Sequence, residues 1–271
     1  MDTLLIIKAA ILGVVEGLTE FLPVSSTGHL IVASDLLSFT GDFANTFNIA
    51  IQAGAILAVC VHFRARLASL VRRCLNEERR LAVNLFWATV PAGLAGLTLH
   101  RAIEHYLFNV PAVAVALIAG GFIIFWVERR QAGCVGVHTM DDITPWLAFK
   151  IGCMQCLALI PGTSRSGATI IGAMALGVSR VAATQFSFFL AIPTIFAATA
   201  YSLFESFRAG GTLFTDGAFT LAFAVGFAVS FASAALVVTW LLRYVSTNSF
   251  NAFGLYRIVF GVALLAYALA F

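Results

Sequence analysis

The sequence has few charged side chains and few cysteines. Of its 271 residues, 11% are Asp, Glu, Lys or Arg, whereas 61% are hydrophobic. Soluble globular domains carry about 25% charged residues, so this composition excludes such a domain. The five cysteines include Cys153 and Cys156, which lie in apolar sequence with no second Cys or His pair at metal-ligand spacing. They therefore indicate neither a disulfide framework nor a zinc site.

A basic segment is also missing before the first apolar run, which begins at Leu4 and contains Glu16 and Glu20. These features are not those of a cleaved signal peptide. Six further apolar runs have roughly the 20 residues that a helix needs to cross a hydrocarbon core. They lie near residues 46–63, 81–100, 111–127, 184–204, 217–242 and 252–271. We therefore expect an all-α polytopic membrane protein with about six transmembrane spans, folded as a single membrane domain over residues 1–271.

Basic residues are concentrated in two of the connections between these spans, although the net charge is only +3. They are Arg64, Arg66, Arg72, Arg73, Arg79 and Arg80 in the first connection, and Arg129 and Arg130 two spans later. The positive-inside rule places both connections in the cytoplasm. We interpret the basic run as a cytoplasmic loop beside lipid head groups and expect no nucleic-acid binding. Counting spans from these loops places the N-terminal segment outside the cytoplasm.

Two stretches of the chain, 13–31 and 152–170, align without a gap at a separation of 139 residues. Identical residues at matched positions include Ser25 with Ser164 and Gly28 with Gly167. The separation predicts two repeats, over about 1–130 and about 140–271. Each repeat would contain one polar-interrupted hairpin and three spans, and an odd number of spans inverts the second repeat. The hairpins would then enter from opposite faces and meet near the centre of the membrane.

Each predicted hairpin is interrupted by residues that cannot continue a helix. The first, over residues 4–35, is broken at 22–28, and the second, over residues 145–178, is broken at 161–167. Both breaks contain a proline, which lacks the N–H that a helix needs, and a glycine, which permits a turn. Non-helical backbone at this depth persists only where it lines a protein cavity. We therefore expect two re-entrant helical hairpins whose breaks are buried against each other.

Glu16 and Glu20 are four residues apart and would share one face of the first helix. A charged side chain at the centre of a bilayer costs about 2.5–3.5 kcal/mol, so the two carboxylates need compensation. A divalent cation, a shared proton or the guanidinium of Arg165 would provide it. A buried ion pair that only ties the repeats together is the structural alternative.

Hydroxyl and basic side chains surround both breaks. Thr163, Ser164, Arg165 and Ser166 precede an apolar run, so they would lie at a helix N-terminus, which attracts anions such as phosphate. They would otherwise act only as helix caps. Ser25, Ser26, Thr27 and His29 supply groups for nucleophilic or acid–base chemistry, although His29 alone could be a structural hydrogen-bonding residue. Gln155 occupies the position that matches Glu16, where its amide would contact substrate or a carboxylate, or be structural.

Together these motifs resemble those of undecaprenyl-diphosphate phosphatases of the bacitracin-resistance type. The resemblance is carried by Glu16-x-x-x-Glu20 with the following 21–29 (FLPVSSTGH), and by 161–169 (PGTSRSGAT), and it extends over nearly the whole chain. It implies a bacterial inner-membrane hydrolase that acts on a phosphoric anhydride. Such an enzyme converts undecaprenyl diphosphate to undecaprenyl phosphate and inorganic phosphate, which recycles the lipid carrier for cell-wall synthesis and counteracts bacitracin.

The resemblance also assigns roles to residues of this chain. It implies a site that faces the periplasm and contains a divalent cation, Mg²⁺ or Ca²⁺. Glu16 and Glu20 would hold this cation or, alternatively, transfer protons. Ser26 or a water molecule would attack, and His29 would act as acid and base. Arg165 would bind the diphosphate. The further residues expected to bind substrate are Ser25, Thr27, Thr163, Ser164, Ser166 and Gln155.

Secondary transporters share the architecture of inverted repeats with broken helices, so a transporter or flippase of a lipid phosphate or small anion is the alternative function. The cluster of Glu16, Glu20 and His29 favours an enzyme, because transport of an anion mainly requires the positive side chain. A purely structural subunit would leave the buried charges unexplained. Membrane lipids are expected partners, and small residues on helix faces permit a homodimer.

Overall fold

The computed structural model describes residues 3–73, 79–131, 135–208 and 217–270, and this part of the chain is built from helices. The α-helices are α1 (Thr3–Thr19), α2 (Ser26–Leu36), α3 (Asp42–Ala50), α4 (Gln52–His62), α5 (Arg64–Arg73), α6 (Arg79–Leu107), α7 (Val110–Gln131), α8 (Pro145–Gln155), α9 (Arg165–Ala175), α10 (Arg180–Arg208), α11 (Gly217–Thr247) and α12 (Asn251–Ala270). Two short 3₁₀ helices, η1 (Met140–Asp142) and η2 (Cys156–Leu159), complete them. The predicted all-α fold is confirmed.

Among the described residues, six helical segments are long and apolar enough to cross a membrane, as the sequence predicts. They are Phe43–His62, Arg79–Leu99, Val110–Gln131, Arg180–Glu205, Gly217–Thr247 and Asn251–Leu269. The first combines α3 and α4, which meet at Ile51. One expectation was wrong in detail: the basic loop between the first two spans includes helix α5. Its apolar positions, such as Leu67 and Leu70, pack against the core of the protein, which a solvated loop would not do.

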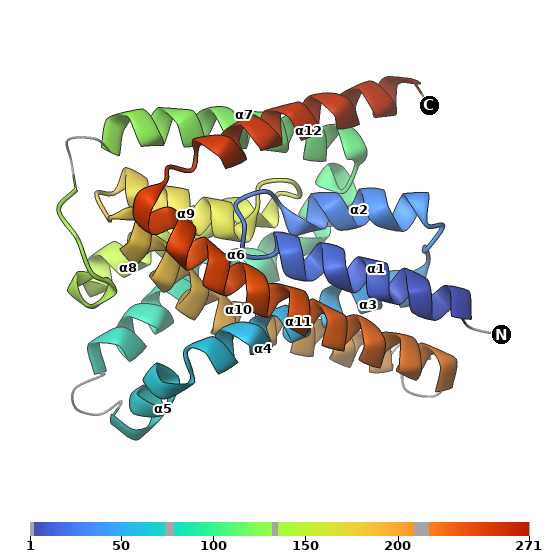
Figure 1. Cartoon of the computed structure of the whole chain (residues 1–271), viewed down its shortest axis with the longest axis horizontal. Coiled ribbons are helices and arrows are strands. Elements are labelled where there is room, and N and C mark those ends of the chain that lie inside the picture. Colours follow the sequence, from blue (N-terminus) through green and yellow to red (C-terminus); the bar gives the residue numbers. More distant parts are fainter. Residues whose placement is uncertain (1–2, 74–78, 132–134, 209–216, 271) are drawn as a thin grey trace.

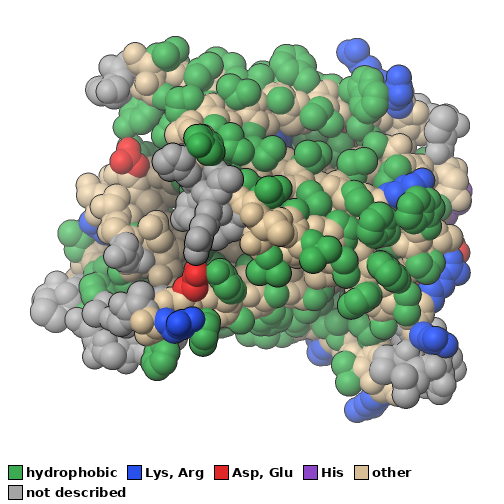
Figure 2. Space-filling model, turned by 180° about the vertical axis from the view of Figure 1, so that it is seen from behind, with side chains coloured by type: hydrophobic (Ala, Val, Ile, Leu, Met, Phe, Trp, Pro, Cys, Tyr) green, Lys and Arg blue, Asp and Glu red, His purple; other side chains and the backbone are tan. Residues whose placement is uncertain are grey.

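The surface separates an apolar belt from charged ends. Figure 2 shows hydrophobic side chains over much of the face between the two ends, with Lys and Arg side chains gathered mainly at the end that carries α5. Such a belt is the surface that a lipid environment requires of a membrane protein.

The two broken segments form helix–loop–helix units at opposite ends of the molecule. Figure 1 shows α1 and α2 at the end where both chain termini lie, and α8 and α9 at the end that carries α5. The interruptions between their helices, at residues 20–25 and 160–164, lie toward the middle of the protein. Both units therefore direct their non-helical backbone to one interior region.

Small residues allow the long helices to support these units closely. A Cβ added to Gly13 of α1 would lie 2.5 Å from the carbonyl oxygen of Gly226 of α11, and one added to Gly152 of α8 would lie 2.4 Å from that of Ala88 of α6. No side chain fits at such distances, so each hairpin helix contacts the backbone of a spanning helix. Small residues at helix interfaces permit this approach in membrane proteins.

Candidate active site

The two interruptions end in the same unusual backbone geometry. Ser25 precedes α2 with φ 72°, and Ser164 precedes α9 with φ 74°. These angles are uncommon for residues other than glycine and need support from their surroundings. Each serine side chain caps its helix, accepting from the N–H of Gly28 at 3.3 Å or of Gly167 at 3.0 Å. Two helix N-termini therefore begin beside the interior region with matched geometry.

Hydrogen bonds join the two interruptions directly. The fully buried Ser166 hydroxyl donates to the main-chain oxygen of Leu22 at 2.7 Å. The hydroxyls of Ser164 and Ser166 are 3.0 Å apart. The interruptions predicted to face each other are therefore in contact.

The carboxylate of Glu20 connects one residue from each unit. Its Oε2 accepts a hydrogen bond from the Ser26 hydroxyl at 2.5 Å, and its Oε1 lies 3.0 Å from Nη2 of Arg165. The Glu20 and Arg165 side chains are only 7% and 14% exposed, so this ion pair is largely removed from solvent. The arrangement places a hydroxyl, a carboxylate and a guanidinium in one contiguous cluster.

Contacts from α10 and from the first interruption hold Arg165 in place. Its Nη1 donates to the main-chain oxygen of Ser187 at 3.1 Å, and the Phe21 ring lies 5.9 Å from its guanidinium carbon. The hydroxyls of Ser187 and Thr169 are 2.6 Å apart and both side chains are fully buried. The Nε of Arg165 is buried without a hydrogen-bond partner among the described residues. This donor is therefore unused within the described part of the chain.

Glu16 lies one helical turn before Glu20 and is fully buried. Neither of its carboxylate oxygens has a hydrogen-bond partner in the described part of the chain, although Glu20 and Arg165 are within electrostatic reach. An unpaired buried carboxylate is costly. Its two free oxygens, beside those of Glu20, are the hard donors that Mg²⁺ and Ca²⁺ prefer, so these two residues fit a divalent cation. Among the described residues, no three or more His, Cys, Asp or Glu side chains are placed together so that they could hold a metal ion. A cation at Glu16 and Glu20 would therefore draw other ligands from substrate or water.

His29 lies next to this cluster but makes its hydrogen bonds elsewhere. Its Nδ1 donates to the main-chain oxygen of Ser25 at 2.7 Å, which leaves Nε2 to accept from the Tyr256 hydroxyl at 2.6 Å. The imidazole also stacks on Phe260, with ring centroids 4.3 Å apart. The ring is thus held from α12, and its recorded bonds do not reach Ser26, Glu20 or Arg165.

The remaining predicted residues lie at varying distances from the Glu20 cluster. Thr27 and Thr163 are half-buried at the two interruptions. Gln155 is buried, but its amide nitrogen is 3.4 Å from the Ala88 carbonyl oxygen of α6 and its Oε1 has no partner among the described residues. The structure thus connects Gln155 to a helix interface and not to the Glu20 carboxylate.

Residues of α10 and α12 are the ones that the sequence did not indicate. Arg257 of α12 contacts residues of both interruptions. Tyr256 and Phe260 of α12 contact His29 in α2, and Ser187 of α10 contacts Arg165 at the start of α9. A charged residue inside an apolar span was the available signal for Arg257, because such residues are rare and functional in membranes. No comparable signal singled out Tyr256 or Ser187.

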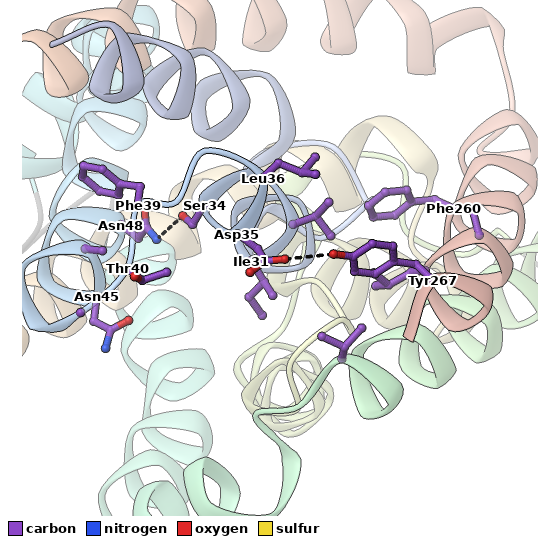
Figure 3. Close-up of a pocket in the computed structure, with 16 residues that line it drawn as sticks. Ile31, Ser34, Asp35, Leu36, Phe39, Thr40, Asn45, Asn48, Phe260 and Tyr267 are labelled. Atoms are coloured by element: carbon purple, nitrogen blue, oxygen red, sulfur yellow. Dashed lines mark hydrogen bonds between the residues drawn. The ribbon is translucent and has the colours of Figure 1, made fainter. Parts of the chain in front are cut away.

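A mainly apolar cavity of about 530 Å³ lies beside the His29 side of the site. Figure 3 shows Asp35 and Tyr267 pointing toward each other in its lining, and the Ser34–Asn48 hydrogen bond at another part of it. Phe260, which stacks on His29, also lines the cavity. A ligand in this space would therefore reach to within one side chain of His29.

Comparison with known proteins agrees with this geometry. The family described as bacitracin resistance protein BacA matches residues 9–263. A protein named undecaprenyl-diphosphatase from Acidovorax ebreus is 54% identical, with 99% of this chain and 97% of the relative covered. Relatives of the same name from Dechloromonas aromatica and Nitrosomonas europaea are 52% and 49% identical, each over 98% of this chain and 96% and 95% of their own lengths. The chain therefore belongs to the bacitracin resistance protein BacA family.

Proposed function

We propose that this protein hydrolyses undecaprenyl diphosphate to undecaprenyl phosphate and inorganic phosphate, and so confers resistance to bacitracin. The observation that carries the proposal is the Glu20 carboxylate, which accepts the Ser26 hydroxyl and pairs with Arg165 from the opposite unit. A nucleophile, its base and a cation for phosphate are the parts that phosphoryl transfer needs. The relatives' shared name gives the substrate.

Ser26 is the nucleophile in this proposal. Its proton passes to Glu20 as Oγ forms a bond to the terminal phosphorus, and the bond between that phosphorus and the bridging oxygen breaks. Undecaprenyl phosphate leaves. Water then attacks the phosphoserine, which releases inorganic phosphate and restores the Ser26 hydroxyl. The free Nε of Arg165 and the N-termini of α2 and α9 bind phosphate oxygens throughout.

Mg²⁺ or Ca²⁺ held by Glu16 and Glu20 would neutralise phosphate charge in this site. The two unpartnered oxygens of Glu16 support this part of the proposal. His29 orients the start of α2 through its bond to Ser25. In its protonated form it is the candidate acid for the departing phosphate. Ser25, Thr27, Thr163, Ser164 and Ser166 border the phosphate region. Gln155 is the weakest substrate contact of the set, because its amide faces α6.

We further propose that the chain is an inverted repeat, with units over about 1–130 and about 140–271. Helix bounds support this: α6 and α11 begin at 79 and 217 and end at 107 and 247, so they nearly coincide when the 139-residue separation is applied. Helices α7 and α12 correspond similarly. The hairpins at opposite ends would be re-entrant. The basic end would be cytoplasmic in the bacterial inner membrane, and the α1–α2 hairpin would open to the periplasm.

The cavity beside His29 would receive part of the prenyl chain of the substrate. Its lining is mainly apolar, and it begins at Phe260, one ring away from His29. An apolar cavity with a few polar groups suits a prenyl chain that must lie next to a charged diphosphate. The exposed apolar side chains of the spans would contact membrane lipids.

Release of phosphate from a long-chain prenyl diphosphate tests the function. The purified protein in detergent is compared with Glu20→Gln and Arg165→Ala, each with Mg²⁺ and with a chelator. Removal of the base is expected to slow release by about 10²–10⁴-fold. Arg72→Ala on the exposed side of α5 is the matched control for loss of an arginine and should keep full activity. A folded wild type that releases no phosphate with any divalent cation would overturn the proposal.

The same preparation separates the enzyme from a transporter. Reconstituted liposomes that translocate the lipid phosphate without hydrolysing any diphosphate would support the flippase alternative. Hydrolysis lost in both Glu20→Gln and Arg165→Ala would place residues of both hairpins in one hydrolytic site.

A further inference from the structure

Arg257 is the largest of the fully buried side chains among the described residues, and it lies in the N-terminal half of α12. Only 1% of its surface is exposed. No ion pair between its guanidinium and a carboxylate is found in the described part of the chain. A buried cation without an anion needs a complete set of hydrogen-bond acceptors, because burying it unsatisfied costs about 3 kcal/mol or more.

Main-chain carbonyl groups supply all of those acceptors. Nη1 donates to the Pro23 oxygen at 3.0 Å and to the Thr163 oxygen at 2.9 Å. The other bonds run from Nη2 to Gly162 at 3.0 Å and Ala116 at 3.1 Å, and from Nε to Leu117 at 3.3 Å. An arginine has five N–H donors, so every donor is used. A single nitrogen, Nη1, therefore joins the interruption of the first hairpin to that of the second.

The neighbouring helices pack tightly around the Arg257 guanidinium. A Cβ added to Gly120 of α7 would lie 2.1 Å from Nη2 of Arg257, and one added to Gly167 of α9 would lie 3.0 Å from Nη1. The guanidinium is thus enclosed between α7 and the start of α9. Its position is fixed by packing as well as by hydrogen bonds.

We propose that Arg257 is a positioning residue that clamps the carbonyl groups of Pro23 and Thr163 together and thereby sets Ser26 and Arg165 at one fixed distance across the phosphate. This rests on the proposed hydrolytic function. Pro23 lies three residues before Ser26, and Thr163 lies two before Arg165. The clamp also supports the left-handed backbone of Ser25 and Ser164, which needs such constraint. Arg257 itself has no donor left for substrate, so it acts through the residues that it holds.

The kinetic test uses Arg257→Gln and Arg257→Lys in the full-length protein. A displacement of about 1 Å in a reacting group can cost about 10²-fold in rate, so we expect Arg257→Gln to lower kcat by that order while KM changes little. Lysine keeps the charge but has three donors without the planar fork, so Arg257→Lys should recover only part of kcat. A wild-type kcat in Arg257→Gln would overturn the proposal, as would a fall in kcat that only follows a fall in the folded fraction.

A pair of glycine variants tests the clamp without removing the arginine. Gly120→Ala would push the guanidinium away from its acceptors, whereas Gly93→Ala in α6 meets nothing within 4 Å. We expect a lowered kcat for the first and wild-type kinetics for the second. Equal kinetics for the two variants would contradict the clamp even if Arg257→Gln fails to fold.

A distance measurement separates this proposal from the hydrolytic function. Spin labels are attached at Leu18→Cys and Leu157→Cys, two exposed positions beside the interruptions, after the five native cysteines are replaced by serine. Double electron–electron resonance then measures the distance between the two labels. A narrow distance distribution that broadens in Arg257→Gln supports the clamp, whatever the activity. An unchanged distribution overturns it, whereas an inactive wild type overturns only the function.

Discussion

The Tyr256 hydroxyl lies 2.6 Å from Nε2 of His29, although the two residues are 227 positions apart in the chain. The opposite ring nitrogen of His29 donates to Ser25, so the two bonds fix both the tautomer and the orientation of the imidazole. Tyr256, in the last helix, therefore orients the side chain of His29, near the start of the chain.

Tyr256→Phe should lower kcat and leave KM nearly unchanged. The variant keeps the ring but frees Nε2 of His29, and loss of one hydrogen bond of about 0.5–1.5 kcal/mol corresponds to a rate change of about 2- to 12-fold. Steady-state phosphate release measures it. Tyr244→Phe removes a hydroxyl that bonds only to the Ser249 main chain among the described contacts and should match wild type. An unchanged kcat in Tyr256→Phe would show that catalysis does not depend on the orientation of His29 by Tyr256.

Glu20→Gln and Ser26→Ala should not be additive. If Glu20 accepts the proton of Ser26, each single variant loses the same activated nucleophile, and the double variant should be about as slow as the slower single variant. A double-mutant cycle on kcat measures this. Additive losses would indicate that Ser26 and Glu20 act separately and that water is the nucleophile.

Glu16→Gln should stabilise the protein in a chelator and abolish its stabilisation by Mg²⁺. The substitution replaces a buried carboxylate that has no partner among the described residues with a neutral amide, which is cheaper to bury. A cation that binds the folded state raises its stability through mass action. Thermal unfolding in detergent with and without Mg²⁺ measures both effects. Equal stabilisation of the wild type and the variant by Mg²⁺ would place the cation away from Glu16.

Gly17→Val should lower the free energy of unfolding by about 1–3 kcal/mol, because the added atoms overpack an interface. A Cβ added to Gly17 would lie 2.1 Å from the Ser233 hydroxyl and 2.4 Å from the Ser230 carbonyl oxygen of α11. Gly93→Val, in open space, is the control. Unfolding by a denaturing detergent gives the two free energies. Equal stability of the two variants would show that α1 is not seated against α11 as described.

Ala263→Trp should impair long-chain substrates more than short-chain ones. The indole would fill part of the cavity that Ala263 lines, and loss of ~1 kcal/mol of apolar burial raises KM about fivefold. Val262→Trp, at an exposed neighbouring position outside the cavity lining, is the control. KM is measured with two prenyl chain lengths. If the ratio of the long-chain KM to the short-chain KM is the same in Ala263→Trp and Val262→Trp, the prenyl chain binds elsewhere.

Much of the fold could be predicted because each membrane span is a local signal. Twenty apolar residues identify a span, and Pro23, Gly28, Pro161 and Gly167 mark the interruptions. The repeat predicted that the two interruptions meet. It also allowed Arg165 to pair with a carboxylate, which was one of the three predicted ways to compensate Glu16 and Glu20. The helical character of α5 was missed because its arginines dominated the composition of that segment.

The contribution of α12 could not be predicted in the same way. Its polar residues belong to no motif, and their contacts depend on how α12 packs against α7 and the two hairpins. Arg257 satisfies its charge with main-chain carbonyls, so no acidic partner in the sequence marks its role. The bonds of Gln155 to α6 and of His29 to Tyr256 likewise depend on side-chain directions that spacing does not determine.

The location of Arg257 has a consequence for biogenesis. Synthesis proceeds from the N-terminus, and Ser26 and Glu20 are inserted long before α12 leaves the ribosome. The carbonyl groups of Pro23 and Thr163 have no clamp until that last helix arrives. If Arg257 clamps the two interruptions as proposed, a nascent chain stays inactive until it is nearly complete, and truncation before α12 is expected to leave all the motif residues without an assembled site.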